Sequence, residues 1–209
     1  MYSRVILLSP HTDDGELGAG GFISKLADRE CEIYHIAFSA AEKSVPECLP
    51  EDILRSECKR ASAALGIKDG NLFVLNYKVR TFSYCRQDIL EDLIKFRNEI
   101  KPDLVIAPSS HDVHQDHAVI AGESLRAFKN TTVLAYELPW NNITMNATCF
   151  VKLNEGHMEA KVKALECYES QKHKHYFSKD FIYGLARVRG IQAGCYLAEA
   201  FEVSRYFIN

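Results

Sequence analysis

The chain has 209 residues, a formal net charge of −3 at neutral pH and 47% hydrophobic residues, which fits a single globular domain spanning residues 1–209. Its 25 lysines and arginines are scattered along the sequence, so no basic stripe indicates nucleic acid or an anionic membrane as a partner. Because the apolar runs are too short for a bilayer span and the N-terminus is unlike a secretion signal, we expect no membrane insertion and a cytoplasmic location.

Short apolar runs alternate with segments of helical spacing along the chain. In chain order we expect a strand over 4–9, a helix over 19–29, a strand over 31–39, a helix over 50–66, a strand over 71–76, a helix over 86–100, a strand over 102–109, a helix over 116–129 and a strand over 131–138. The less regular final third predicts a strand over 148–153, a helix from about Met158 to Ser170 and a closing strand over 195–203. Strands this apolar are usually covered on both faces, which predicts an α/β fold with a mostly parallel sheet flanked by helices.

Two polar clusters follow strands of this expected sheet. "LLSPHTDDGELGAGG", from Leu7 to Gly21, contains the end of the first strand, and "HDVHQDH" follows the strand over 102–109. Ligands of open α/β sheets bind beyond the carboxyl ends of the strands. We therefore expect both clusters at the same edge of the sheet, in one site.

The glycines of the first cluster do not form a nucleotide-binding loop. Taking Gly18 and Gly20 as the start of G-x-G-x-x-G places Ile23 where the third glycine belongs, and no G-K-S or G-K-T follows a glycine-rich turn. Neither a dinucleotide site nor a phosphate-binding P-loop is indicated.

A divalent metal explains the residue types of both clusters better. His11 and Asp14 can supply two zinc ligands from one turn, leaving Asp13 free to take a proton from the water that the metal activates. The second cluster offers a third ligand in His111, His114 or His117. Two alternatives without a metal remain open: the aspartates could have no role other than capping a helix, and the histidines could belong to a solvated loop.

The two clusters resemble the signatures of the PIG-L or LmbE-like zinc-dependent deacetylases, H-P-D-D-E and H-x-D-H. The resemblance extends over nearly the whole chain: "RSECKRASAALGI" is similar to an arginine- and glutamate-bearing helix of that family, "KPDLVIAPSSHDVHQDH" to its second metal loop, "KVKALECYESQ" to its penultimate helix and "RVRGIQAGCYLAEAFEV" to its C-terminal signature. It implies a Rossmann-like three-layer fold with the active site at the carboxyl ends of the strands, and removal of an N-acetyl group from an amino sugar, sugar nucleotide or glycoside.

The resemblance also implies roles for particular residues. One zinc ion per subunit, or another divalent transition metal, would be held by His11, Asp14 and His117, and Asp13 would be the general base. His114 would be a protonated group that stabilises the oxyanion or hands a proton to the leaving amine.

Three further roles follow from the same comparison and from the expected loops. Asp116 would orient a histidine without itself binding the metal, a role that carboxylates often take beside metal ligands. Arg55 would hold sugar hydroxyls. Arg80 and Arg86 lie in the segment between the third strand and the next helix, where one of them could contact a phosphate or carboxylate of the substrate, or both could lie in a solvated loop.

Two positions depart from the family pattern. Thr12 replaces the usual proline, and Gly15 stands where many members carry glutamate, with Glu16 next in line. We assign Glu16 no catalytic function and read it as an acid in the first helical turn.

The sequence leaves two other functions open: hydrolysis of a different acyl group or an ester on the same scaffold, and sugar binding without catalysis at a retained metal site. The expected partner is a small N-acetylated sugar; assembly into homo-oligomers is compatible with the sequence. The identity of the sugar and of its aglycone is set by loops that one sequence does not specify.

Overall fold

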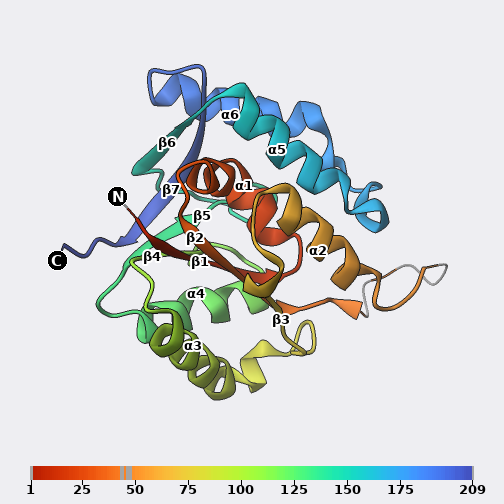
Figure 1. The fold of residues 1–209 in the computed structure, drawn as a ribbon, viewed down its shortest axis with the longest axis vertical. Helices are drawn as coiled ribbons and strands as arrows, with labels where there is room; N and C mark the ends of the chain where they lie inside the picture. The colour runs from red at the N-terminus through yellow and green to blue at the C-terminus, as the bar shows by residue number, and fades with distance from the viewer. Residues whose placement is uncertain (1, 43–44, 46–48, 209) are drawn as a thin grey trace.

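The structure, a computed structural model, describes residues 2–42, 45 and 49–208. Seven strands of the described chain form one sheet in the order β3-β2-β1-β4-β5-β7-β6 (Figure 1). The strands are β1 (Arg4–His11), β2 (Glu32–Ser39), β3 (Leu72–Val74), β4 (Leu104–Pro108), β5 (Thr132–Tyr136), β6 (Cys149–Leu153) and β7 (Leu197–Arg205). β1 to β5 run parallel to one another, whereas β7 runs antiparallel to both of its neighbours, β5 and β6.

Helices cover both faces of the sheet (Figure 1). One face carries α1 (Asp14–Ala27), α2 (Ile53–Ala64), α5 (Glu155–Glu166) and α6 (Lys179–Gln192), and the other carries α3 (Arg86–Ile100) and α4 (Gln115–Ala127). Successive residues of β1 point to opposite faces, so Val5 and Leu7 join the core beneath α1 while Ile6 and Leu8 join the core beneath α3 and α4. The predicted three-layer α/β fold with a mostly parallel sheet is confirmed.

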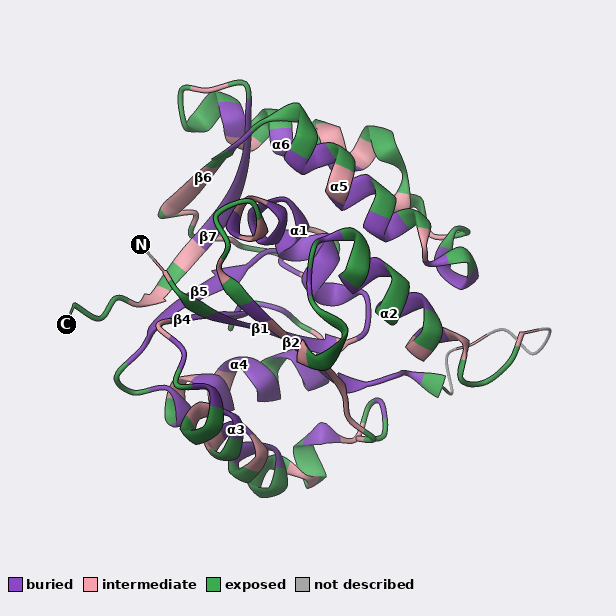
Figure 2. Cartoon of the chain, in the orientation of Figure 1, coloured by how far each residue is buried: buried purple, intermediate pink, exposed green. Residues whose placement is uncertain are grey.

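Helix α1 begins at Asp14, earlier than the predicted start at residue 19, and its glycines allow it to pack closely against the sheet. A Cβ atom at Gly15 would collide with Ser9 Oγ, and one at Gly18 would collide with the ring of Tyr136. The helix therefore lies directly against β1 and β5, and it is buried along most of its length (Figure 2).

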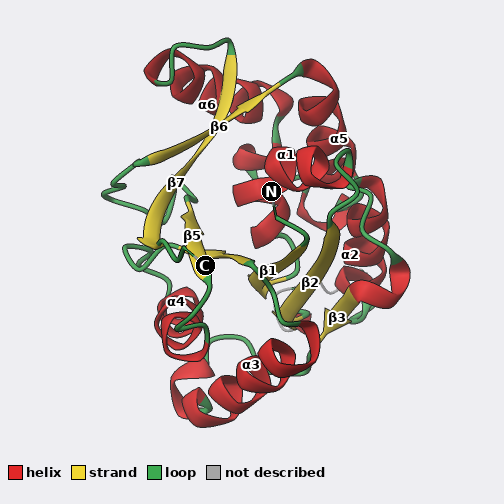
Figure 3. Cartoon of the chain, turned by 60° about the vertical axis from the view of Figure 1, so that its left-hand side comes forward, coloured by secondary structure: helices red, strands yellow, loops and turns green. Residues whose placement is uncertain are grey.

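The C-terminal third contains both predicted strands, as the antiparallel pair β6 and β7 at the end of the sheet away from β3 (Figure 3). Helix α5 ends at Glu166, so the predicted extension to Ser170 is wrong. The N–H and hydroxyl of Ser170 donate to the buried Glu57 carboxylate at 3.0 and 2.6 Å, which holds this segment in the single-turn helix η4 (Glu169–Gln171). Helix α6 was not predicted.

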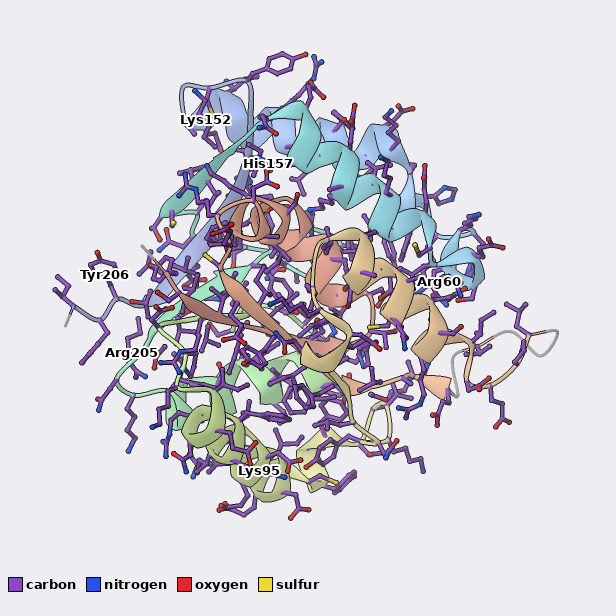
Figure 4. All side chains as sticks on the ribbon, viewed as in Figure 1. Arg60, Lys95, Lys152, His157, Arg205 and Tyr206 are labelled. Atoms are coloured by element: carbon purple, nitrogen blue, oxygen red, sulfur yellow. The ribbon has the colours of Figure 1, made fainter. Side chains whose placement is uncertain are left out.

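Charged side chains lie on the outer surfaces of the helices (Figure 4). Lys95 projects from the exposed face of α3, and Arg60 of α2 donates to the carbonyl of Cys167 at the end of α5, at 3.3 Å. None of the described helices is both long and apolar enough to cross a membrane.

Candidate active site

The two polar clusters meet at one edge of the sheet, as predicted from their positions directly after two parallel strands. β1 ends at His11 and leads into α1, while β4 ends at Pro108 and leads to α4, whose N-cap residue is His114. β1 and β4 are neighbouring parallel strands, so their carboxyl ends lie side by side. Helix N-termini and loops at this edge therefore present the polar side chains to one site.

Three donor atoms form a nearly equilateral triangle in this site. His11 Nδ1 lies 3.1 Å from Asp14 Oδ2 and 3.2 Å from His117 Nε2, and His117 Nε2 lies 3.1 Å from Asp14 Oδ2. Tetrahedral zinc with ligands at about 2.0–2.1 Å would separate those ligands by roughly 3.3 Å. The donor triangle of His11, Asp14 and His117 therefore fits a zinc ion in both size and ligand type.

A wider grouping of metal-binding side chains combines His11 and His117 with His114 instead of Asp14. One nitrogen of the His114 ring already accepts the N–H of Asp116, at 3.2 Å. In the set with Asp14, each of the three pairs of donor atoms is 3.2 Å apart or less. We therefore take Asp14 as the third donor.

Two carboxylates contact the donor histidines at the ring nitrogens that face away from the triangle. Asp116 Oδ2 lies 3.1 Å from His11 Nε2, and Asp112 Oδ2 lies 2.7 Å from His117 Nδ1. An ionised carboxylate accepts a hydrogen bond, so each of these ring nitrogens carries a proton, and the opposite nitrogen is the one that would give its lone pair to a metal. Asp116 thus lies where the sequence placed it; Asp112 was not assigned a role, although it belongs to the same "HDVHQDH" cluster.

The charges of the donor triangle are strongly coupled. Burial alone would lower the pKa of His117, but the carboxylates of Asp14 and Asp112 outweigh it and raise this pKa to about 10. Burial alone would raise the pKa of Asp14, but His117 and His11 hold it well below the usual range. The site attracts positive charge, which a divalent cation supplies more strongly than a proton does.

Asp13 lies next to the triangle without belonging to it. Its side chain lines the cavity described below, and Lys174 Nζ lies 4.0 Å from its Oδ2. Burial and the neighbouring charge of Asp14 raise the pKa of Asp13. A buried carboxylate of raised pKa accepts a proton more readily than an exposed one, as a general base requires.

His114 caps the helix that follows the second cluster. As the N-cap of α4, its Nδ1 accepts the N–H of Asp116, so the proton of the neutral ring is on Nε2. Burial, together with the nearby His117 and His11, lowers the pKa of His114. With Nδ1 accepting this N–H, the Nε2 of His114 is the nitrogen that can donate to a ligand in the site.

A cavity of about 220 Å³ has the donor triangle in its wall. Asp13, His114, Arg80 and Lys174 line it together with the rings of Trp140 and Tyr176, which stack at a centroid distance of 3.9 Å. Lys174 and Tyr176 were not predicted. They lie in the segment "QKHKHYF", and no spacing rule connects this segment to either polar cluster.

Two of the predicted substrate-binding arginines do not line this cavity. Arg55 donates to the Glu42 carboxylate, to the Asn76 side chain and to the backbone carbonyls of Val74 and Leu75. Arg86 donates through two nitrogens to the buried carboxylate of Glu123. Their hydrogen bonds connect elements of the fold, whereas Arg80 is on the cavity wall.

Behind the first motif, a buried tyrosine holds the turn that carries the donors. The hydroxyl of Tyr168 lies 2.5 Å from the Thr12 carbonyl and 2.9 Å from Glu16 Oε1. The expected first-turn acid Glu16 is therefore fully buried and in contact with Tyr168, away from the cavity. Contact with the Thr12 carbonyl fixes the turn between His11 and Asp14.

Glu16 also belongs to a second buried grouping of metal-binding residue types, with His35 and Cys58. Both ring nitrogens of His35 are already occupied by serine hydroxyls, Ser9 Oγ at 2.7 Å and Ser62 Oγ at 2.9 Å. Burial lowers the pKa of His35 to about 4, so the ring is neutral. Because both ring nitrogens of His35 are used by serines, we assign no second metal centre to this grouping.

Comparison with known proteins places the chain in a family. Residues 6–128, more than half of the chain, match the family described as GlcNAc-PI de-N-acetylase, PIG-L. A probable N-acetyl-alpha-D-glucosaminyl L-malate deacetylase 2 of Bacillus cereus is 30% identical over 138 residues, and the match spans 61% of this chain and 61% of that relative's length.

Solved structures share the fold at lower identity. The N,N'-diacetylchitobiose deacetylase of Pyrococcus horikoshii superposes with a TM-score of 0.82 at 23% identity, covering 97% of this chain and 84% of that chain. The 4-carboxy-2-hydroxymuconate hydratase GalB of Pseudomonas putida superposes with a TM-score of 0.81 at 19% identity, covering 99% and 98%. Since these two proteins have different activities, the fold alone does not decide the reaction. With the family match over residues 6–128, the chain belongs to the PIG-L family of de-N-acetylases.

Proposed function

We propose that this protein is a zinc-dependent hydrolase that removes the N-acetyl group of an amino sugar, sugar nucleotide or glycoside. The observation that carries the proposal is the donor triangle of His11, Asp14 and His117, with the Asp13 carboxylate beside it on the cavity wall. Metal ligands next to a separate carboxylate are what hydrolysis of an amide by an activated water requires. Membership of the PIG-L family supports an acetamido sugar as the substrate.

In this proposal His11, Asp14 and His117 hold one zinc ion, or another divalent transition metal. Bound there, the ion supplies Lewis acidity, polarising a carbonyl and bringing the pKa of a water molecule to about 7. Asp116 and Asp112 keep the two imidazole rings in the tautomers that present lone pairs to the triangle.

The remaining steps belong to side chains of this protein. Asp13 takes a proton from the attacking water as the water oxygen bonds to the acetyl carbon. The Nε2–H of His114 donates to the carbonyl oxygen as negative charge develops on it, a type of contact whose loss costs about 10²- to 10³-fold in rate. Asp13 then passes its proton to the amide nitrogen, the C–N bond breaks, and acetate and the free amine leave.

Acetate release tests this function. Zinc-loaded protein would be offered N-acetylglucosamine glycosides, sugar nucleotides and N-acetylated aminoglycosides, with Asp13→Asn in parallel and Asp180→Asn, an exposed acid in the first turn of α6, as the matched control. We expect release by wild type and control, and a loss of roughly 10²- to 10⁴-fold in Asp13→Asn while its zinc content stays equal. Release by Asp13→Asn at the wild-type rate would contradict the assignment of the base.

A second candidate is hydrolysis of another acyl group or of an ester by the same machinery. This candidate remains because the chain also shares its fold with GalB, a hydratase, and one fold can support different reactions. It predicts zinc- and Asp13-dependent turnover of acyl esters, with no acetate from any acetamido sugar.

A further inference from the structure

A buried glutamine lies on the wall of the cavity that contains the donor triangle. Gln171 belongs to the single-turn helix η4, is only 3% exposed and lines the cavity. The proton transfers proposed above give it no role. A buried amide costs stability unless its polar atoms are hydrogen-bonded, so the partners of each atom show what this residue can still bind.

The backbone of Gln171 is fully used within the fold. Its N–H donates to the carbonyl of Tyr168 at 3.0 Å, and its carbonyl accepts the N–H of Lys174 at 2.9 Å. The side-chain amide is therefore the part of this residue that can contact a ligand in the cavity.

A buried carboxylate fixes the neighbouring serine. Glu57 of α2, which is 0% exposed, accepts the N–H of Ser170 at 3.0 Å through Oε1 and the hydroxyl of Ser170 at 2.6 Å through Oε2. A serine hydroxyl has one proton, and this short distance is typical of a hydroxyl that donates to a carboxylate. The proton of Ser170 is thus committed to Glu57, and Ser170 Oγ can only accept a further hydrogen bond.

This arrangement determines the orientation of the Gln171 amide. The amide atom beside Ser170 Oγ must be a donor, and Nε2 lies there at 2.9 Å. Oε1 lies on the other branch of the amide, and no residue among 2–42, 45 and 49–208 donates a hydrogen bond to it. The amide therefore presents its oxygen, and not its nitrogen, on the side away from Ser170.

Other polar groups of the same wall already have roles in the proposed reaction. Asp13 is the general base and Asp14 a metal donor, whereas His114 donates to the carbonyl oxygen. The amide oxygen of Gln171 is uncharged and is not among the usual ligands of zinc. The partner that remains for this acceptor is a hydrogen-bond donor of the bound molecule, and hydroxyl groups are the donors that every sugar carries.

We propose that Gln171 determines specificity by accepting a hydrogen bond from one hydroxyl group of the bound sugar, and that Ser170 and Glu57 are positioning residues that orient its amide for this contact. The proposal rests on the proposed function and identifies a further binding residue of that site. A sugar without the hydroxyl would leave Oε1 without a donor, and a site built around a hydroxyl discriminates strongly against an analogue that lacks it.

Calorimetric titration tests the proposal without turnover. Zinc-loaded protein would be titrated with methyl glucosaminide, a deacetylated sugar, and with its 3-deoxy, 4-deoxy and 6-deoxy analogues. In wild type we expect one of the three analogues to bind about fivefold more weakly than the parent sugar, the loss expected for one hydrogen bond. Gln171→Met should bind the parent sugar about fivefold more weakly than wild type does, and should no longer distinguish it from that analogue.

The combination of the two changes separates a direct contact from a general loss of binding. If the substitution and the missing hydroxyl acted independently, together they would weaken binding by about 25-fold, whereas a shared hydrogen bond gives about fivefold. Zinc content and urea unfolding show whether each variant is folded. Gln87→Met removes an exposed amide from the first turn of α3 and should match wild type with all four sugars.

Ser170→Ala tests the positioning role. It keeps the backbone N–H that donates to Glu57 but removes the oxygen that holds Gln171 Nε2. The amide can then turn, so we expect the preference for the parent sugar over the sensitive analogue to fall to about twofold while zinc content stays equal. A wild-type preference in this variant would overturn the positioning role of Ser170 and Glu57.

The outcome is separable from that of the acetate assay. Equal or undetectable binding of the four sugars by wild type, or independent losses in Gln171→Met, would overturn the role of Gln171, and acetate release would still decide the deacetylase. Dependence of sugar binding on Gln171 and on one hydroxyl, in a protein that releases no acetate from any acetamido sugar, would overturn the deacetylase and leave the sugar contact.

Discussion

Replacing Asp116 by asparagine is expected to weaken zinc binding although Asp116 is not a donor of the triangle. Its fully buried carboxylate accepts three hydrogen bonds: from His11 Nε2 at 3.1 Å and Arg80 N at 2.6 Å, both to Oδ2, and from Phe82 N at 3.3 Å to Oδ1. Asparagine has one acceptor oxygen and an amide group that donates. One of the three donors must therefore face another donor.

The orientation of the new asparagine amide determines how much stability is lost. With its oxygen at the Oδ2 position, the substituted side chain would keep His11 and Arg80 as partners and lose only the longer bond from Phe82. An unmet buried donor costs about 1–3 kcal/mol, so the metal-free protein should lose about 2 kcal/mol of stability. His11 also loses the charged acceptor that fixes its tautomer, and substitutions of such partners typically cost about 10- to 100-fold in metal affinity.

Competition with a chromophoric chelator measures the zinc affinity, and urea unfolding in excess chelator measures the metal-free stability. Asp180→Asn is the control and should match wild type in both. Zinc affinity of Asp116→Asn within about threefold of wild type would refute the reasoning that this carboxylate orients His11 for metal binding.

Three further outcomes follow from the structure. Tyr168→Phe leaves the Thr12 carbonyl without its hydroxyl partner, so we expect about 1–3 kcal/mol lower stability in urea unfolding and weaker zinc binding, whereas an unchanged zinc affinity would mean that the turn holds its shape without this contact. Burial lowers the pKa of His35 to about 4 in the folded protein, against an ordinary 6.5, so between pH 6.5 and pH 4 only the unfolded chain takes up this proton. The free energy of unfolding should therefore fall by up to about 3 kcal/mol as the pH drops from 6.5 to 4. In denaturant titrations at stepped pH, His35→Gln should remove this contribution to the pH dependence of stability. Arg55→Met should lower stability by about 1–2 kcal/mol and leave KM unchanged, since its donors are occupied within the fold; a raised KM at normal stability would restore it as a substrate contact.

The layered fold and the meeting of the two motifs could be predicted because both depend on local patterns. Apolar runs such as β4 identify buried parallel strands, and the polar residues that follow them must lie at the carboxyl edge of the sheet. The start of α1 was predicted late because glycine is a poor helix former, and only contact with Ser9 and Tyr136 shows why glycine stands there.

The features that the sequence did not predict depend on contacts between distant parts of the chain. Arg86 looks like a free loop cation until Glu123 is placed beside it, and Lys174 has no link to Asp13 in the sequence. The contact of His114 with the N–H of Asp116 depends on its position as the cap of α4, which the sequence did not show. Helix α6 has glycines at two interior positions, 184 and 190, which weaken its helical signal.

The donor triangle joins parts of the chain that are far apart, since His11 and His117 are separated by 106 positions. An ion shared between them would act as a cross-link that closes a loop containing β2, β3 and β4, because the unfolded chain has no comparable site. Each tenfold rise in free zinc above the dissociation constant would then add about 1.4 kcal/mol to the free energy of unfolding. The abundance of the folded protein, and not only its turnover, would follow the supply of the metal.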